Sequence, residues 1–256
     1  MTSETIVVEA VTALFTEFDA TKAGALIDPD YIQHNPQVPT GAAAVLGFLP
    51  ALKESGITTT THRMISEGDL VVLHVTYDNA QLFGGEHMVT FDVFRVEDGK
   101  LAEHWDNLVA VTPPNPSGHT QTDGATTIVD LEKTAANKLL VENFIEVVLK
   151  NGDGDRITEF VSTDLYIQHN SDIADGLDGL GAAIAAWVDQ GITMKYDTVH
   201  LVVGEGNFVF TASEGILGGK RSAFFDMFRI EDGKIVEHWD TITEIPSEMA
   251  HDNGKF

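Results

Sequence analysis

Histidine and aspartate residues occur together at two places in the chain with matching spacing. Imidazole and carboxylate side chains are the groups that most often move protons near neutral pH. A further histidine precedes each set, inside a Tyr-Ile-Gln-His-Asn segment. The candidate catalytic residues are Asp92, His104, Asp106 and His34 in the first half, and Asp226, His238, Asp240 and His169 in the second. The pattern predicts acid–base chemistry in each half of the chain.

The two sets belong to an internal repeat that covers almost the whole chain. The repeated segments are Tyr-Ile-Gln-His-Asn at 31–35 and 166–170, Glu-Asp-Gly-Lys at 97–100 and 231–234, and Glu-His-Trp-Asp at 103–106 and 237–240. Because their order and spacing agree, we expect two copies of one domain. Residues 112–127 are rich in Pro, Gly, Ser and Thr, which is typical of a linker. We therefore predict domains at 1–124 and 125–256.

The composition restricts the classes of partner. The chain has 256 residues, of which 43% are hydrophobic, enough for packed cores. A net charge of −25 repels phosphate groups, so we expect neither nucleic acid nor an anionic membrane as a partner. No signal peptide or membrane-spanning run is visible, and cysteine is absent. We expect a cytoplasmic protein.

Each copy is predicted to begin with helices and to continue with strands. The apolar residues Val7, Val11, Leu14, Phe15 and Phe18 have the spacing of one helical face. The expected elements of the first copy are further helices over 20–27 and 42–53, and strands over 63–65, 70–79, 87–96 and 100–111. Helices followed by an antiparallel sheet indicate an α+β fold, in which a curved sheet would wrap around the helices and enclose a pocket.

The turn at Glu-Asp-Gly-Lys decides which polar residues share a sheet face. If Gly99 forms a left-handed bulge, Asp92 lies opposite His104, and strand alternation places both with Asp106 on the pocket face. A simple two-residue turn would slip the register by one residue and separate Asp92 from His104. We prefer the bulged turn because it groups the polar residues.

The other face of the sheet is predicted to be mostly apolar. Arg95 would pair there with Glu103, beside Trp105, and Trp239 takes the same place in the second copy. An apolar sheet face needs a cover. We therefore expect the two copies to pair as an intrachain pseudo-dimer.

These motifs resemble the SnoaL-like polyketide cyclase family, within the nuclear transport factor two-like superfamily. The resemblance implies tandem cone-shaped α+β barrels, each with a deep apolar pocket and cofactor-free acid–base chemistry. Such chemistry includes aldol ring closure, isomerisation and dehydration. The resemblance assigns the acid/base aspartate to Asp106 and Asp240, the neighbouring polar group to His104 and His238, and a pocket position to His34 and His169.

The leading hypothesis is an enzyme that acts on a small carbonyl compound without a cofactor. Asp106 would move a proton next to the carbonyl, His104 or His34 would polarise the carbonyl, and Asp92 would orient a histidine tautomer. The alternative is a non-catalytic protein that binds a small apolar or carbonyl-bearing molecule in each pocket. A metal site in the His/Asp cluster ranks last, because no HxH or HxxxH spacing supports it. We therefore expect no metal.

Overall fold

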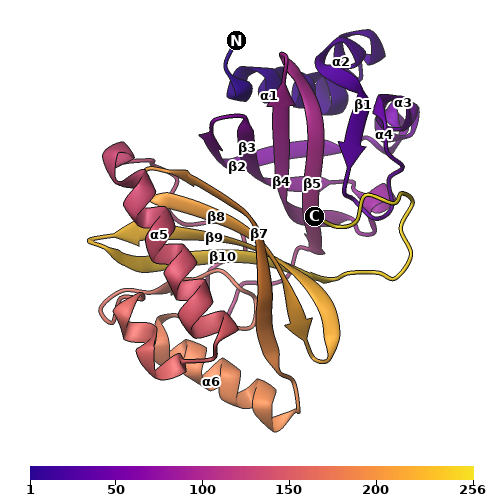
Figure 1. Cartoon of the computed structure of the whole chain (residues 1–256). Coiled ribbons are helices and arrows are strands. Elements are labelled where there is room, and N and C mark those ends of the chain that lie inside the picture. The colour runs from indigo at the N-terminus through magenta and orange to yellow at the C-terminus, as the bar shows by residue number, and fades with distance from the viewer. The chain divides into compact units, whose positions relative to one another are not determined.

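A computed structural model describes residues 1–256 and divides the chain into two compact units (Figure 1). Unit 1 comprises Met1–Val111 together with Pro246–Phe256, and unit 2 comprises Thr112–Ile245. Each unit combines helices with one five-stranded sheet, which confirms the predicted α+β class in both halves.

Unit 1 begins with helices and continues with an antiparallel run of strands, as its sequence predicts, but a strand that was not predicted lies among the helices. Its helical elements are α1 (Ser3–Thr12), the π-helical turn η1 (Ala13–Glu17), α2 (Ala20–Leu26), α3 (Ala42–Gly47), α4 (Leu49–Ser55) and the short 3-10 turn η2 (Gln81–Phe83). Its strands are β1 (Ile27–Gln33), β2 (Thr58–Glu67), β3 (Leu70–Asp78), β4 (His87–Glu97) and β5 (Lys100–Ala110). The region expected as one helix over 42–53 is two short helices.

Side-chain caps begin the first helices of unit 1, and a left-handed backbone conformation ends the helical segment that follows α1. The hydroxyl of Thr2 accepts from the Thr5 N–H, and the carboxylate of Asp19 accepts from two N–H groups at the start of α2. Both are N-caps, which satisfy amide groups without a partner inside the helix. Phe18, with φ of 52°, ends η1. The predicted apolar face is real: Val7 and Leu14 are buried in the core.

The sheet of unit 1 has the order β1-β5-β4-β3-β2 and is open at both edges. Strands β2 to β5 form an antiparallel meander, whereas β1 pairs with β5 in parallel. β1 can run parallel to β5 because a long excursion separates them in the chain, rather than a hairpin. Strand β1 contains the start of the Tyr-Ile-Gln-His-Asn motif, and its pairing with β5 places that motif directly beside Glu-His-Trp-Asp.

The turn between β4 and β5 differs from the prediction. Asp98 and Gly99 have φ of 49° and 77°, and Glu97 pairs with Lys100, so this is a two-residue turn of the primed type. The bulge lies inside β5 instead, at Ala102: Leu101 and the residue after Ala102 pair with consecutive residues of β4. Relative to the predicted bulged turn, the two-residue turn and the bulge at Ala102 each shift the pairing of β4 with β5 by one residue. The two shifts add up to two residues, so each side chain stays on its predicted face of the sheet.

The register therefore corrects one prediction and confirms another. Asp92 lies opposite Asp106, not opposite His104 as predicted. His104 is instead opposite Phe94, diagonally adjacent to Asp92 on the same face. The predicted grouping of Asp92, His104 and Asp106 on one face is correct, because a shift of two residues leaves the faces unchanged.

Unit 2 repeats this plan with different helices. Its helical elements are η3 (Leu131–Lys133), α5 (Thr134–Phe144), η4 (Ile145–Lys150), η5 (Gly154–Glu159) and α6 (Gly176–Asp189). Its strands are β6 (Ile167–Gln168), β7 (Met194–Glu205), β8 (Phe208–Leu217), β9 (Lys220–Glu231) and β10 (Lys234–Glu244), in the sheet order β6-β10-β9-β8-β7. Helix α5 crosses one face of this sheet (Figure 1). The β10 strand has its own bulge, at Val236.

None of the helices combines the length and the apolar character that crossing a membrane requires.

Candidate functional site

Unit 1 contains a cavity between its helices and the inner face of its sheet. The empty space of this cavity, together with the open solvent at its mouth, is about 680 Å³. Most of its wall is apolar or aromatic, formed by Leu14, Phe15, Tyr31, Val38, Val45, Phe48, Leu52, Tyr77, Phe83, Phe94 and Leu108. Its other lining residues are polar and come from β1, β4 and β5 or the segment after β1: Gln33, Asn35, Asp92, His104 and Asp106. An apolar wall with a few convergent polar groups is typical of a small-molecule site.

Gln33 determines the tautomer of His104. Its Oε1 atom accepts from the backbone N–H of Asn35 at 2.8 Å, so this atom is the amide oxygen. The same oxygen lies 3.0 Å from His104 Nδ1, which must therefore carry a hydrogen and donate it. His104 Nε2 lies 3.1 Å from Asp92 Oδ1. The imidazole and this carboxyl consequently share one proton, as imidazolium with carboxylate or as neutral imidazole with carboxylic acid.

Asp92 is buried in the wall of the cavity. Its second oxygen accepts a hydrogen bond from the Tyr77 hydroxyl at 3.0 Å. Burial raises the pKa of Asp92, since water no longer solvates its charge, although the hydrogen bond from His104 opposes the shift. Burial also raises the pKa of Tyr77 well above its ordinary value, with the nearby Asp92 charge adding to the effect. Tyr77 is therefore a permanent donor to Asp92.

Asp106 differs from Asp92 in having one oxygen without a hydrogen bond. Asn35 Nδ2 donates to Asp106 Oδ2 at 2.6 Å, whereas the buried Oδ1 accepts none. The closest cation is Lys255, from the C-terminal segment, whose Nζ lies 3.7 Å from Oδ1 and donates to the Asp106 backbone carbonyl at 2.5 Å. Burial lowers the pKa of Lys255, and the Asp106 charge opposes this. Asp106 Oδ1 is thus an open acceptor in the wall of an apolar cavity.

Unit 2 holds the matching residues in a similar arrangement, except that both oxygens of its second aspartate accept a hydrogen bond. His238 Nε2 lies 3.0 Å from Asp226 Oδ1, and Asn170 Nδ2 donates to both oxygens of Asp240 at 3.0 and 2.7 Å. Burial lowers the pKa of His238, but the hydrogen bond to Asp226 and the two carboxylate charges outweigh it, so the net shift is upward. The pKa of Asp240 is raised, by burial first and by the Asp226 charge.

The tyrosine that donates to the buried aspartate comes from a different strand in each unit. In unit 1 it is Tyr77 on β3, whereas in unit 2 it is Tyr196 on β7, which lies 3.2 Å from Asp226 Oδ2. Gly215 occupies on β8 the place that Tyr77 has on β3, and it pairs with Tyr196. Both units therefore keep a hydroxyl on this carboxyl, although the two tyrosines do not correspond in sequence.

Two predicted site residues, His34 and His169, do not face the cavity side. His34 stacks on Trp105 at 5.0 Å between ring centroids, and its Nε2 lies 2.8 Å from Glu103, on the opposite face of the sheet. His169 stacks on Trp239 at 4.6 Å in the same way. The predicted pocket position of both is wrong, because alternation along β1 turns Gln33 and Asn35 inward and therefore turns His34 outward.

The structure brings the remaining predicted residues together. One side-chain N or O atom from each of Asp92, His104 and Asp106 lies within 4.8 Å of the other two, and the same holds for Asp226, His238 and Asp240. Each group has donor atoms suited to a metal ion. An ion at the histidine Nε2 would have to replace the proton shared with the first aspartate, because Nδ1 is engaged by glutamine.

Sequence reasoning missed four residues of the unit 1 site. Gln33 and Asn35 belong to the repeated Tyr-Ile-Gln-His-Asn motif, so their repetition as Gln168 and Asn170 was a usable signal. Tyr77 has no repeated counterpart, and Lys255 lies in a segment far away in the chain. For those two residues the sequence offered no signal.

Comparison with protein families identifies the repeat. The model of the SnoaL-like domain matches residues 8–104 and again residues 141–238. Each match falls inside one of the two units. No curated protein sequence matches the chain.

Three similar solved structures each cover less than half of this chain. TsrD from Streptomyces laurentii is 22% identical, with a TM-score of 0.36 over 41% of this chain and 87% of TsrD. IdmH from Streptomyces antibioticus, a candidate polyketide cyclase, is 19% identical, with a TM-score of 0.35 over 42% of this chain and 92% of IdmH. An NTF2-like protein of unknown function from Cytophaga hutchinsonii is 15% identical, with a TM-score of 0.36 over 43% and 91%.

Proposed function

The chain belongs to the SnoaL-like domain family, and from this premise we propose that it is an acid–base enzyme acting on a small carbonyl compound without a cofactor. The reaction class is proton transfer next to the carbonyl, followed by aldol ring closure, isomerisation or dehydration. The observation that supports this most directly is the open oxygen of Asp106. A buried carboxylate oxygen without a hydrogen bond is costly to maintain and is ready to take a proton.

In the first step, Asp106 Oδ1 takes the proton from the carbon next to the carbonyl. The C–H electron pair moves into the carbon–oxygen system and forms an enolate. Asn35 holds the other oxygen of Asp106 in place, so Oδ1 stays directed at the substrate. The apolar wall excludes water, which would otherwise solvate and weaken this base.

The pair Asp92–His104 supports the developing negative charge. The proton that the pair shares lies in the cavity wall. Gln33 accepts a hydrogen bond from His104 Nδ1, and Tyr77 donates one to the second oxygen of Asp92. An enolate oxygen next to this pair would receive the proton or a hydrogen bond from it. The proton on Asp106 is then delivered to the alkoxide formed by ring closure, or to another carbon in an isomerisation. A proton that the enolate oxygen took from the Asp92–His104 pair returns to the pair when the enol becomes a carbonyl again. Both outcomes therefore return every residue to its starting state.

Hydrogen exchange tests this chemistry without knowledge of the natural substrate. We would incubate the protein in D2O with a panel of small cyclic and aryl ketones and follow loss of the α-hydrogen signal by NMR. For any ketone that the wild type exchanges, Asp106→Asn combined with Asp240→Asn should slow exchange by about 100-fold or more, the usual contribution of a positioned base. The single variants show how much each unit contributes.

Asp30→Asn is the matched control, because it makes the same chemical change at an exposed position of unit 1. It should exchange at the wild-type rate. Wild-type exchange in a folded double variant would refute the assignment of the base.

A non-catalytic binding protein is the second candidate, and the predominance of apolar and aromatic side chains in the cavity wall favours it. Such a protein would hold a small apolar or carbonyl-bearing molecule without turning it over. Native mass spectrometry of the purified protein would reveal a retained molecule. Its recovery chemically unchanged after long incubation, with no α-hydrogen exchange, would support binding over catalysis.

A further inference from the structure

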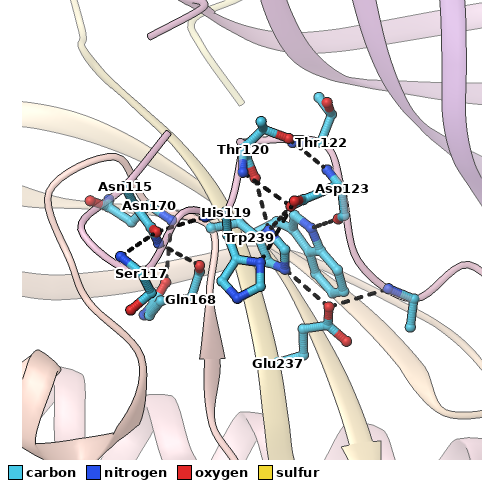
Figure 2. A network of polar contacts seen from close by, with 12 residues as sticks. Asn115, Ser117, His119, Thr120, Thr122, Asp123, Gln168, Asn170, Glu237 and Trp239 are labelled. Atoms are coloured by element: carbon cyan, nitrogen blue, oxygen red, sulfur yellow. Dashed lines mark hydrogen bonds and ion pairs between the residues drawn. The ribbon is translucent and has the colours of Figure 1, made fainter. Parts of the chain in front are cut away.

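A second cluster of histidines and carboxylates lies in unit 2, away from the Asp226–His238 pair. We propose that His119, Asp123 and His169 form a binding site for a divalent transition-metal ion, with Zn²⁺ as the best fit. His169 packs on Trp239 and Glu237, whose side chains lie on the sheet face opposite His238 and Asp240. The two other ligands, His119 and Asp123, come from the segment that precedes α5, and both are labelled in Figure 2.

The carboxylate of Asp123 lies between the two imidazoles. Its Oδ1 is 2.8 Å from His169 Nδ1, and its Oδ2 is 3.6 Å from His119 Nδ1. One ligand atom from each residue lies within 4.8 Å of the others. Two ligands of a tetrahedral zinc ion lie about 3.3 Å apart, because each bond is about 2.0 Å long. The observed separations lie on both sides of that value, so small side-chain rotations would complete the site.

A carboxylate holds the far nitrogen of each histidine. His119 Nε2 lies 3.1 Å from Asp175 Oδ2, and His169 Nε2 lies 3.0 Å from Glu237 Oε1. Metal-binding histidines characteristically donate their second N–H to a carboxylate, which orients the ring and makes the ligating nitrogen more basic. Both histidines have this arrangement, and both therefore turn Nδ1 towards Asp123.

The surroundings of His169 contain acceptors but no donor. Its Nδ1 faces the Asp123 carboxylate and the Thr120 carbonyl, the latter at 2.8 Å, and its Nε2 faces Glu237. A neutral imidazole carries one hydrogen and cannot satisfy acceptors on both sides. Either a second proton, which makes an imidazolium, or a metal ion at Nδ1 removes this conflict, and the metal ion also binds the nitrogen and the oxygens together. The Thr120 carbonyl could supply a fourth ligand.

The local charge also favours a dication. Asp123, Asp175 and Glu237 contribute three negative charges, and the cation paired with them is Arg229, whose Nε donates to Glu237 Oε2 at 2.6 Å. The side chain of His169 is completely buried, whereas those of His119 and Asp123 are 32% and 44% exposed. An ion can therefore reach the buried His169 from solvent by way of the partly exposed His119 and Asp123 side chains.

Unit 1 lacks this site, although it has the same histidine. His34 has its carboxylate, Glu103, at Nε2, but its Nδ1 faces only the Gly254 carbonyl at 3.0 Å. The nearby His251 bonds to the Asn35 carbonyl through Nε2. No carboxylate takes the place of Asp123. The proposal therefore predicts one such ion per chain and not two.

The test is metal titration of the full chain after treatment with a chelator and removal of that chelator. Zn²⁺ would be titrated against a chromophoric competitor, and Co²⁺ would be added separately to detect the visible absorption of a tetrahedral site. We expect one tight site per chain. His119→Ala, at a partly buried position, and Asp123→Ala, at an exposed one, should each weaken Zn²⁺ binding by at least about 10-fold, and Asp175→Asn by roughly 10-fold.

Two variants serve as controls. His251→Ala removes the corresponding tail histidine of unit 1, and Asp226→Asn alters the His/Asp cluster on the other face of the unit 2 sheet; both should bind Zn²⁺ as the wild type does. Circular dichroism of each metal-free variant establishes that it is folded. Absence of a stoichiometric site, unchanged affinity in a folded Asp123→Ala protein, or loss of the site in Asp226→Asn would each overturn the proposal.

Discussion

Replacing Gln33 with methionine tests whether one amide oxygen organises the candidate site. Gln33 Oε1 accepts from the Asn35 N–H and from His104 Nδ1. It also accepts from the His34 N–H, but that group has a second acceptor in the His104 carbonyl. Methionine has a similar length and shape but no comparable acceptor. The variant therefore leaves two donors without their acceptor while changing the packing little.

The expected loss of stability follows from those two donors. A buried donor left unsatisfied costs about 1 to 3 kcal/mol, and the more apolar methionine offsets roughly 1 kcal/mol of the total. We expect Gln33→Met to lower the free energy of unfolding by about 1 to 5 kcal/mol, the cost of two donors less this offset. With a urea slope of roughly 2 kcal/mol/M, the midpoint for unit 1 falls by about 0.5 to 2.5 M.

Two measurements check this reasoning. Urea titration monitored by tryptophan fluorescence reports stability, and ¹⁵N spectra of the imidazole nitrogens report the tautomer of His104. In the wild type, Nδ1 should carry a hydrogen; in Gln33→Met the preference for this tautomer should weaken. Gln37→Met makes the same substitution at an exposed position and should change neither. A stability loss below about 0.5 kcal/mol, or an unaltered His104 spectrum, would refute the role given to Gln33.

Three further perturbations address other contacts of the two sites. Lys255→Met removes the buried cation beside Asp106 and should destabilise unit 1 by about 3 kcal/mol in urea titration, because a buried charge loses its partner. The raised pKa of His238 stabilises the folded protein below its unfolded pKa of about 6.5, and this contribution is lost as pH rises through the folded pKa. The stability difference between wild type and His238→Gln should therefore shrink from about pH 6 to about pH 9; a constant difference would contradict the pairing with Asp226. Tyr196→Phe removes the hydroxyl bonded to Asp226 and should cost about 1.5 kcal/mol in thermal or urea unfolding, and no measurable cost would mean that this bond is not made in solution.

Much of the site could be predicted because strand alternation is a local property. Asp92, His104 and Asp106 share a face whether the register is the predicted or the observed one, since the two differ by an even number of residues. The pairing of Arg95 with Glu103 was predicted for the same reason, and their 2.8 Å contact confirms it. The compensating bulge at Ala102 could not be foreseen, because no residue type requires it.

The position of His34 shows where local reasoning ends. Its motif was recognised, but its direction depends on how β1 pairs with β5, two strands that lie about 70 residues apart in the chain. That pairing turns Gln33 and Asn35 into the cavity and His34 onto Trp105. The repeat alone does not distinguish the inward from the outward members of a motif, because both are repeated.

Short-range spacing along the chain predicts the α+β order of elements and the polar face of the β4–β5 hairpin. Comparison of the two halves of the sequence reveals the duplication, and the repeated motifs carry the family resemblance. Long-range packing selects the residues that complete each site. Lys255 reaches Asp106 from the C-terminal segment, Tyr77 and Tyr196 reach equivalent carboxyls from different strands, and His119 meets His169 across 50 residues of chain. Contacts of this kind arise when the chain closes long loops to bury apolar surface, and residue spacing does not record them.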